Sequence, residues 1–569
     1  MKPRHTASGR KLLAVLIAAL ASPFNFAAEP AATAPVAEGI VELPPLEVSA
    51  GLVKVRPWQY TMHGGIEILS RCTDAVTSEL AQSVYRAEQL FAYLVPEEFQ
   101  VKLAVPKILV LADQKSTPSS SRDLVQGFSR IDNVRFLPNL RLNDLDAVVI
   151  YAIVDEDHFD GMRLGLTPGH IRFVLERRTP PLPAWLIEGI TGLTPDLSFD
   201  RGGLGLGPAD WLAGPEEENL KKDADFPRTL LPMGELLERP RAPEPADQSD
   251  RARRWRAQSA LFVRWALDGA DPLRRTVFWR FVKQACAMPV TEAMFQDCFA
   301  LSYADVRDRL SDYLPGALKN PVRVQPEKLA KLPDPQLRLA TSAEIGRIKG
   351  DWERLEITYV KNLHPQYVAR YEEQANLTLT KAYASDPSDA GLKAVIALRA
   401  CDAGDDARAR PFLEAAMQAK VVRPRVYYEL ARIRYAEALK QPAGRDGLLS
   451  AEQANTVLQP LAATSGQLPP LAQTYALAAE VWSHSDARLS PSHLALLDDG
   501  LRLFPMQLTL LYQVALVKMR QGLEPDALAL VERGQQLAAT ATAKARFEKL
   551  RAFIAGRRGP SATATGEGK

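Results

Sequence analysis

The first part of the chain mixes short apolar runs with longer stretches in which apolar residues recur every three or four positions. The second kind of pattern runs from Val76 to Leu94 and stops at Pro96, which predicts an amphipathic helix. Gly64-Gly65 between two short apolar runs predicts a tight β-hairpin. Strands are predicted at 58–62, 66–70, 108–111 and 147–154, with one more within 128–137.

After residue 160 the pattern becomes helical. Helices are predicted at 163–178, 184–195, 232–238, 254–268, 273–288, 292–299 and 303–314. The glycine-rich stretch 203–207 follows a helix and has no phosphate-binding partner, so it is interpreted as a surface loop or hairpin. Strands followed by helices predict an α+β domain that spans residues 51–315.

Beyond a Pro- and Lys-containing linker at 316–337 the strand patterns stop. Two long helical patterns cover 339–360 and 367–384, and prolines then open successive helix pairs. The pairs are 390–403 with 406–419, 424–439 with 450–464, 468–484 with 490–503, and 507–521 with 525–538. Small residues are placed where paired helices approach closely, at Ala397, Ala415, Ala431, Ala479 and Ala515.

A spacing slightly above 34 residues between helix–turn–helix units resembles tetratricopeptide (TPR) repeats. This resemblance predicts an all-α TPR-like helical-repeat domain, an α-solenoid, over residues 338–556. An irregular helical bundle is the alternative, and in both cases each helix pair buries its apolar face against the next.

The two ends of the chain carry little folding information. Basic residues precede an unbroken apolar run from Leu12 to Ala21, and small residues follow at Ala27-Ala28, which predicts a secretory signal peptide at 1–28. Ten apolar residues are too few to span a bilayer, and no later run is long enough, so no transmembrane segment is expected. We predict a flexible linker at 29–50, a disordered tail at 557–569, and a soluble bacterial protein that is periplasmic or secreted.

Charge gives no support for a nucleic-acid partner. Four of the 70 basic residues and none of the 68 acidic residues lie in 1–28, so the exported chain has 66 basic against 68 acidic residues. A basic cluster surrounds Trp255, but it stands at the start of a helical pattern and is interpreted as a solvated helix entrance. Its members are Arg251, Arg253, Arg254 and Arg256.

The block at 168–193, PGHIRFVLERRTPPLPAWLIEGITGL, is the most informative stretch. It resembles the active-site region of peptidase-MA-like gluzincins, a superfamily of zinc metallopeptidases, and the resemblance covers roughly residues 58–315. In that family a helix with HExxH supplies two zinc ligands and a catalytic Glu, and a second helix supplies a third ligand. The second helix is retained here as Pro183, Trp185, Glu188 and Gly189.

The first half of the zinc motif is missing. In the preferred register Pro168, Gly169 and Arg172 stand where the family has its first His, its Glu and its second His. Sliding the register by two residues places His170 at the first ligand position, but Ile171 and Val174 then replace the base and the second ligand. The resemblance therefore implies a degenerate site, and we expect no metal and no other cofactor.

The remaining candidate residues in this block can be explained by structural roles, without a catalytic one. Glu188 is expected to pair with Arg172 or another basic residue, or to cap a helix, and a general-acid role is the alternative. His170 is expected to be a hydrogen-bonded surface or core histidine, and Trp185 to pack between the two helices. These four residues, His170, Arg172, Trp185 and Glu188, mark a vestigial cleft, with no catalytic residue assigned.

Export permits disulfides, and four cysteines are present. Cys286 and Cys298 lie on consecutive predicted helices, with Pro289 in the turn between them. This spacing allows a disulfide, and the alternative is two buried free thiols. Cys72 and Cys401 fall in different predicted domains and are expected to stay separate. No C-x-x-C motif occurs, which makes a redox catalyst improbable.

The sequence therefore favours an exported, non-catalytic protein-interaction module. A degenerate metallopeptidase-like domain is joined to helical repeats that bind a protein or peptide partner. The alternative is an active exported hydrolase with an unrecognised site around Glu188. Pure scaffolding in an envelope complex is a third hypothesis.

Overall fold

The structure is a computed structural model that describes residues 56–557 except for several internal stretches. The stretches left out are 102, 115–120, 122–124, 126–138, 160–168, 194–196, 201–202, 207–228, 245–246, 248, 269–271, 325–332 and 465. The predicted signal peptide, the linker at 29–50, the strand within 128–137 and residues 558–569 of the predicted tail lie outside the described residues.

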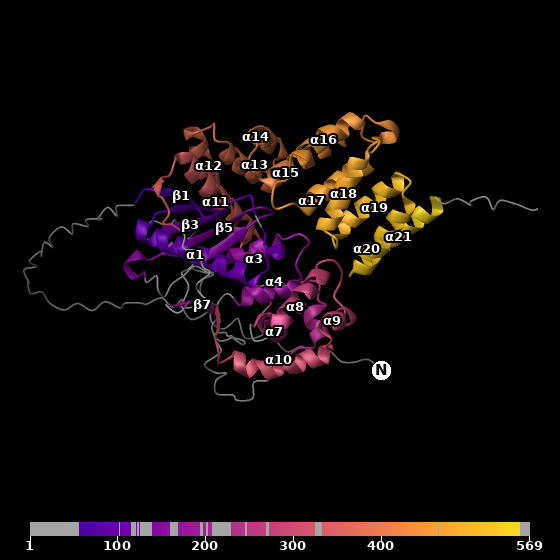
Figure 1. Cartoon of the computed structure of the whole chain (residues 1–569). Helices are drawn as coiled ribbons and strands as arrows, with labels where there is room; N and C mark the ends of the chain where they lie inside the picture. Colours follow the sequence, from indigo (N-terminus) through magenta and orange to yellow (C-terminus); the bar gives the residue numbers. More distant parts are fainter. Residues whose placement is uncertain are drawn as a thin grey trace, which may run out of the picture. The chain divides into compact units, whose positions relative to one another are not determined.

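A six-stranded sheet forms the centre of the N-terminal part, with strand order β4-β5-β3-β2-β1-β9 (Figure 1). Its members are β1 (Gln59–His63), β2 (Ile66–Ser70), β3 (Lys107–Asp113), β4 (Asn139–Asn143), β5 (Val148–Val154) and β9 (Arg338–Leu339). The β1–β2 hairpin turns at Gly64 and Gly65, whose φ angles of 57° and 76° suit the tight turn predicted there. Strands β2, β3 and β5 are parallel, whereas β4 and β9 are antiparallel to their neighbours.

Each face of this sheet is covered by one long helix. Leu109, Ile150 and their neighbours on one face pack against α1 (Asp74–Leu94). On the other face Val110 and Tyr151 pack against α11 (Ser342–Leu363), whose Trp352 ring lies 4.9 Å from that of Tyr151. Strand β5 is buried along its whole length, as expected of a strand covered on both sides.

The first helix of the predicted repeat region is thus part of the core of the sheet. Strand β9 also follows the predicted linker at 316–337, and it pairs with β1, which lies near the start of the described residues. Within that linker the structure places a further short strand, β8 (Val322–Val324). The described residues therefore join the two predicted domains through one shared sheet and one shared helix.

A helical layer with an aromatic core follows the sheet in sequence. It contains α3 (Gly169–Glu176), α4 (Ala184–Gly192), α6 (Met233–Leu237), α7 (Asp250–Leu267), α8 (Pro272–Ala285), α9 (Glu292–Phe299) and α10 (Tyr303–Ala317). The predicted helices agree with these bounds to within a few residues, apart from 163–168, which is not described. The glycine-rich stretch includes β7 (Gly203–Leu206), which pairs with β6 (Leu197–Asp200) and with β8.

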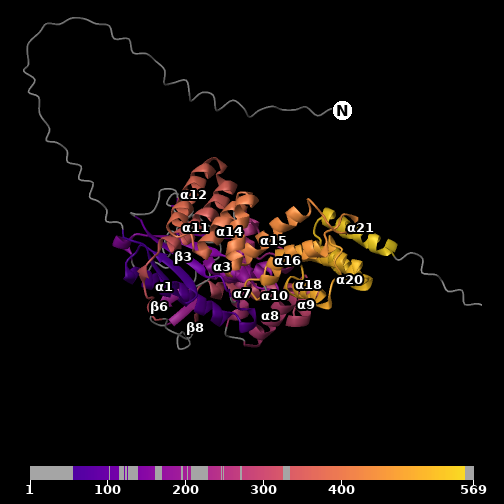
Figure 2. The same ribbon diagram turned by 90° about the horizontal axis from the view of Figure 1, so that it is seen from above.

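The C-terminal part consists of antiparallel helix pairs (Figures 1 and 2). These helices are α12 (Val368–Ser385), α13 (Ala390–Asp402), α14 (Asp406–Gln418), α15 (Pro424–Ala438), α16 (Ala451–Ala463), α17 (Ala472–Ser483), α18 (Pro491–Leu503), α19 (Leu508–Arg520), α20 (Glu524–Leu537) and α21 (Ala541–Arg557). Helical repeats are confirmed, and α21 adds a helix beyond the predicted pairs. None of the described helices combines the length and apolar character needed to cross a membrane.

Small residues allow neighbouring helices to approach closely. Ala397, Ala431, Ala479 and Ala515 are buried as predicted, whereas Ala415 is only half-buried and its neighbour Ala416 is the buried one. The tightest approach in the repeats was not predicted. A Cβ atom on Gly346 of α11 would lie 2.0 Å from the Cβ atom of Ala382 on α12.

We predict that Gly346→Ala lowers the free energy of unfolding by about 1–3 kcal/mol or more, because α11 and α12 must move apart. Gly556→Ala is the matched control, since a Cβ there meets no atom within 4 Å. Alanine favours helix more than glycine does, so the control should be neutral or slightly stabilising. Urea denaturation measures both, and equal stability of the two variants would contradict the close packing.

Candidate functional site

The carboxylate that the zinc-peptidase resemblance singled out is paired with an arginine. Arg172 on α3 donates through Nη2 to Glu188 Oε2 on α4, and the same nitrogen lies 3.2 Å from Thr191 Oγ1. Arg172 Nη1 is also 3.8 Å from Glu176 Oε1. The Glu188 side chain is 13% exposed and that of Arg172 28% exposed. A guanidinium therefore occupies the place beside Glu188 where a cation would have to bind.

His170 lies on the same helix but belongs to a different cluster. It is buried, and its Nε2 is 3.2 Å from Glu88 Oε1 on α1. Lys107 Nζ on β3 contacts the same carboxylate. Burial alone would raise the pKa of Glu88, but His170 and Lys107 outweigh it and lower the pKa below its usual value. The structure thus brings His170 to Glu88 and not to Glu188.

Trp185 is fully buried and has a packing role. Its ring lies 5.4 Å from Phe262, 5.8 Å from Phe281 and 6.0 Å from Phe278, centroid to centroid. Gly189, one turn along α4, is needed for this packing, since a Cβ atom there would lie 2.6 Å from the carbonyl oxygen of Ser259 on α7. Trp185 and Gly189 therefore serve to pack α4 against α7 and α8.

Nothing in the described part of the chain resembles a metal centre. No group of three or more His, Cys, Asp or Glu side chains with suitable placement occurs among those residues. Glu188 faces a guanidinium and His170 faces a carboxylate, so the two candidate ligands of the predicted cleft are already engaged.

All four cysteines are free thiols in the structure, and Cys286 and Cys298 are both buried. The two sulfurs face different partners: Cys286 Sγ is 3.5 Å from Arg178 Nη1, and Cys298 Sγ is 3.6 Å from Gln284 Oε1. Burial raises the pKa of Cys286 to about 11, although Arg178 opposes this. A protonated thiol is a poor nucleophile at neutral pH. Cys72 and Cys401 are likewise unpaired.

The basic cluster at the start of α7 is engaged within the chain. Arg251 pairs with Glu235 and Arg253 with Asp250, whereas Arg256 donates to the carbonyl oxygens of Glu244 and Asp247. These contacts agree with a helix entrance, which was the interpretation from sequence.

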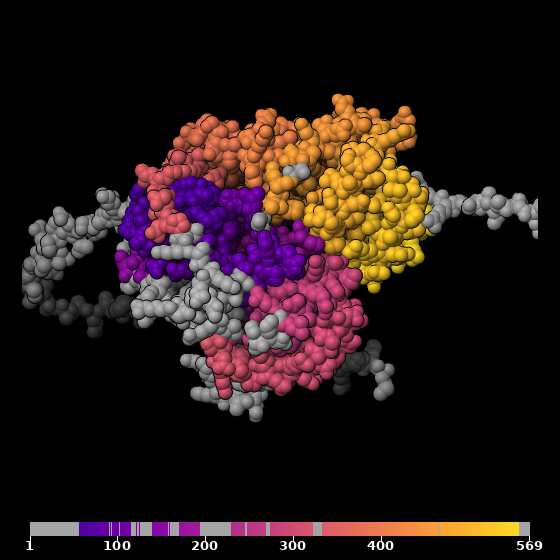
Figure 3. All heavy atoms as spheres, viewed as in Figure 1, coloured from indigo at the N-terminus to yellow at the C-terminus, as the bar shows by residue number. Residues whose placement is uncertain are grey.

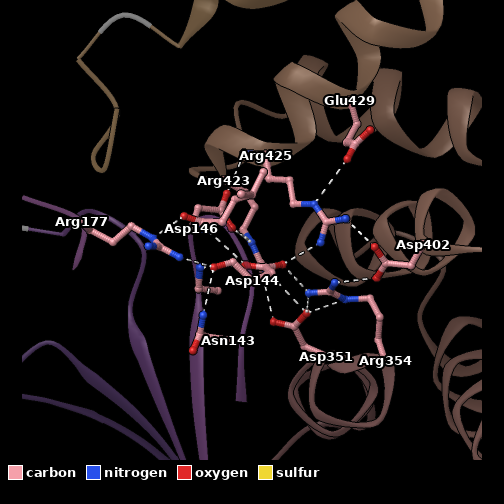
Figure 4. A network of polar contacts seen from close by, with 12 residues as sticks. Asn143, Asp144, Asp146, Arg177, Asp351, Arg354, Asp402, Arg423, Arg425 and Glu429 are labelled. Atoms are coloured by element: carbon pink, nitrogen blue, oxygen red, sulfur yellow. Dashed lines mark hydrogen bonds and ion pairs between the residues drawn. The ribbon is translucent and has the colours of Figure 1, made fainter. Parts of the chain in front are cut away.

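The most extensive polar network lies elsewhere and was not predicted. It joins the turn between β4 and β5 to helices of the repeat region (Figure 4). In the turn, Asp144 Oδ1 accepts the backbone N–H groups of Asp146 and Ala147 at 3.1 and 3.0 Å. Its other oxygen, Oδ2, lies 2.6 Å from Arg354 Nη2 and 2.9 Å from Arg425 Nη1.

The second carboxylate of the turn is held at the start of α15. Asp146 Oδ1 accepts from Arg423 Nε at 2.8 Å, and Oδ2 accepts from the backbone N–H of Arg425 at 2.6 Å. Because Arg425 is in the first turn of α15, its N–H has no partner within the helix and points outward. A guanidinium and a helix N-terminus therefore bind one carboxylate together.

The arginines are also fixed from the repeat side. Arg354 pairs with Asp351 on α11 and with Asp402 at the end of α13, each at 2.7 Å. Arg423 Nη1 lies 3.0 Å from Asp351 Oδ2, and Arg425 contacts Asp402. These side chains are buried or nearly so, with Arg354 and Asp351 each 1% exposed and Asp146 fully buried.

The two carboxylates of the turn respond differently to this environment. Burial would raise the pKa of Asp144, but Arg354, Arg423 and Arg425 outweigh it and hold the pKa well below its usual value. For Asp146, burial and the neighbouring Asp144 carboxylate raise the pKa to about 6 against the effect of Arg423. Of the two carboxylates of the turn, Asp144 is thus the one whose charged form the arginines stabilise more.

Sequence reasoning missed this network because its partners are far apart along the chain. Asp144-Leu145-Asp146 reads as a turn between strands, and Arg423-Pro424-Arg425 reads as the start of a helix. Both interpretations are correct locally, and neither indicates the other. The only available signal was charge in both segments, and that is common on protein surfaces.

Comparisons with known proteins add little. No family model and no curated protein matches the sequence. Solved structures that resemble part of it include YrrB, described as a TPR protein with an unusual peptide-binding site, at 14% identity over 36% of this chain and 99% of that chain, with a TM-score of 0.26. A second is pilF of Pseudomonas aeruginosa, at 15% identity over 38% of this chain and 90% of that chain, with a TM-score of 0.26. A third is yeast Tom70, at 11% identity over 55% of this chain and 51% of that chain, with a TM-score of 0.26. TM-scores this low carry no argument about function.

We predict that Asp144→Asn destabilises the protein by about 3–5 kcal/mol, because it leaves buried guanidinium groups without their shared carboxylate. Asp146→Asn is the matched control in the same turn. It should cost less, about 1–3 kcal/mol, because Asp146 has one arginine partner and its charged form is less favoured. Chemical denaturation at pH 7 measures both, and a larger loss for Asp146→Asn would contradict the assigned roles.

Proposed function

We propose that this chain is an exported, non-catalytic protein-interaction module. Its α+β domain resembles a gluzincin metallopeptidase that has lost its zinc site, and its helical repeats bind a protein or peptide. The observation that carries the proposal is the ion pair between Arg172 and Glu188. In the register inferred from sequence, Arg172 stands at the position of a zinc-binding histidine, and its charge neutralises the carboxylate that would be the third ligand.

The surroundings of the ion pair support the same conclusion. A residual hydrolase would need a group beside Glu188 that activates water or attacks a substrate. The contacts described for Glu188 on α3 and α4 are instead a guanidinium, with Thr191 sharing that guanidinium. The α+β domain then acts through its surfaces, and the repeats supply a helical surface for a partner.

We predict that the triple substitution Pro168→His, Gly169→Glu and Arg172→His creates a zinc site, since it restores HExxH ahead of Glu188. The unaltered protein should purify with far less than one zinc ion per chain, and the triple variant should approach one after dialysis against zinc. Metal content measured by mass spectrometry decides between them.

The control is the same triple variant with Glu188→Gln, which removes the third ligand and should lose most of the bound zinc. Stoichiometric zinc in the unaltered protein, together with chelator-sensitive digestion of casein, would overturn the non-catalytic assignment. A folded triple variant that binds no zinc would refute the gluzincin-like register.

Partner binding through the repeats is tested with the full-length chain. We predict that photo-crosslinking residues at exposed Leu377, Leu439 and Leu496 of the repeats yield adducts with envelope proteins. Positions Leu273 and Met288, on and just after α8, are similarly exposed and serve as controls that should give few adducts. Adducts confined to the control positions would place the partner surface on the α+β domain and contradict the proposal.

A further inference from the structure

The Asp144–Asp146 turn sits in a site that the repeat region builds around a carboxylate pair. The site consists of Arg354 on α11, Arg423 at the cap of α15 and the backbone N–H of Arg425. Both carboxylates of the turn reach it, one from each side of Leu145. In the close-up view the turn points from the sheet toward the helices, and the arginines converge on it (Figure 4).

The arginines of the site also have partners outside the turn. Asp351 pairs with Arg354 and Arg423. Asp402 pairs with Arg354 and Arg425. Arg425 Nε also lies 3.4 Å from Glu429 Oε1 on its own helix, so the turn adds two carboxylates to arginines that already have acidic partners. Charge-assisted, bidentate contacts of this kind are the strong ones among protein hydrogen bonds.

The turn is preorganised for its own role. Asp144 accepts two backbone N–H groups within the turn, and Arg177 on the sheet side donates to the carbonyl oxygens of Leu145 and Asp144 at 2.7 and 2.6 Å. The carboxylates are thus presented in a fixed geometry, as a ligand is presented to a receptor.

Other contacts between the α+β part and the later repeats are simpler. The backbone N–H of Ala104 donates to the carbonyl oxygen of Leu468 at 3.1 Å, and Arg533 on α20 donates to the carbonyl oxygen of Ala287 at 2.7 Å. In the space-filling view the repeats lie directly against the sheet domain (Figure 3). Unlike these single hydrogen bonds to carbonyl oxygens, the network around Asp144 and Asp146 consists of several buried ion pairs.

We propose that the Asp144–Asp146 turn is an internal ligand of the repeats, a latch that holds α15 and the following helices on the α+β domain and that a partner must displace. The competing partner segment would carry two carboxylates separated by one residue. This inference rests on the proposed function, because it names what the repeats recognise. The latch itself is tested separately from any partner.

The test uses the full-length chain with Asp144→Asn and Asp146→Asn together, and a fluorescent peptide with the sequence of residues 141–147. The intact chain presents its own turn at an effective concentration in the millimolar range, so the peptide should bind it weakly. In the double variant the turn no longer supplies carboxylates that compete with the peptide, and fluorescence anisotropy should show affinity at least about tenfold higher. Adding Arg423→Gln to the double variant should abolish this gain.

A control peptide with Asn at both acidic positions should bind neither protein. A double variant that keeps its far-UV circular dichroism and binds the acidic peptide no better than the unaltered chain overturns the latch.

Hydrogen exchange in the unaltered chain decides the matter if the double variant fails to fold. Acidic peptide at about 1 mM should speed exchange at the amide of Ala104, whose N–H donates to the carbonyl oxygen of Leu468 across the surface that the latch holds together. Unchanged exchange at this amide would also overturn the latch. Crosslinking from the repeat positions to partners does not depend on either result, so failure of the latch and failure of the proposed function are distinguishable.

Discussion

Burying several charges in one place is possible only when each charge has partners, and this constraint organises the middle of the molecule. An isolated buried aspartate or arginine costs several kcal/mol, so Asp144, Asp146, Arg354 and Arg423 are stable only as a set. The set draws on three parts of the fold: the β4–β5 turn, the buried helix α11 and the cap of α15. Residues nearly 280 positions apart are thereby fixed in one geometry.

The same rule applies to the ion pair that joins helices α3 and α4. A zinc site needs several uncharged or anionic donors that converge on an empty position. Here the position beside Glu188 is taken by the Arg172 guanidinium, which satisfies the carboxylate and would repel a cation. Trp185 and Gly189 place α4 against the aromatic core on α7 and α8, so this part of the segment has a packing role that needs no metal.

Local patterns predicted local structure well. The helix at 292–299 has the predicted bounds, and the helix pairs of the repeats agree within a few residues, because apolar periodicity and proline positions are properties of neighbouring residues. The pairing of Glu188 with Arg172 could also be considered from the sequence, since the two residues are only 16 positions apart. Strand β9, the burial of α11 against the sheet and the Asp144–Arg423 contacts were not, because they depend on which distant segments meet. Sequence spacing left a disulfide and two thiols open at Cys286 and Cys298, and their partners Arg178 and Gln284 were not apparent from it.

These observations change what the α+β domain contributes. Its β4–β5 turn carries an extensive polar network, in which the carboxylates of Asp144 and Asp146 face the arginines of the helices. Helix α11 adds a second constraint, because its Trp352 face packs on the sheet while its Asp351 and Arg354 side chains join the network. A substitution on α11 thus acts on both parts together. On the proposed function, the domain serves as the ligand and support of its own repeats, and the arginines that hold it decide when the repeats are open to another protein.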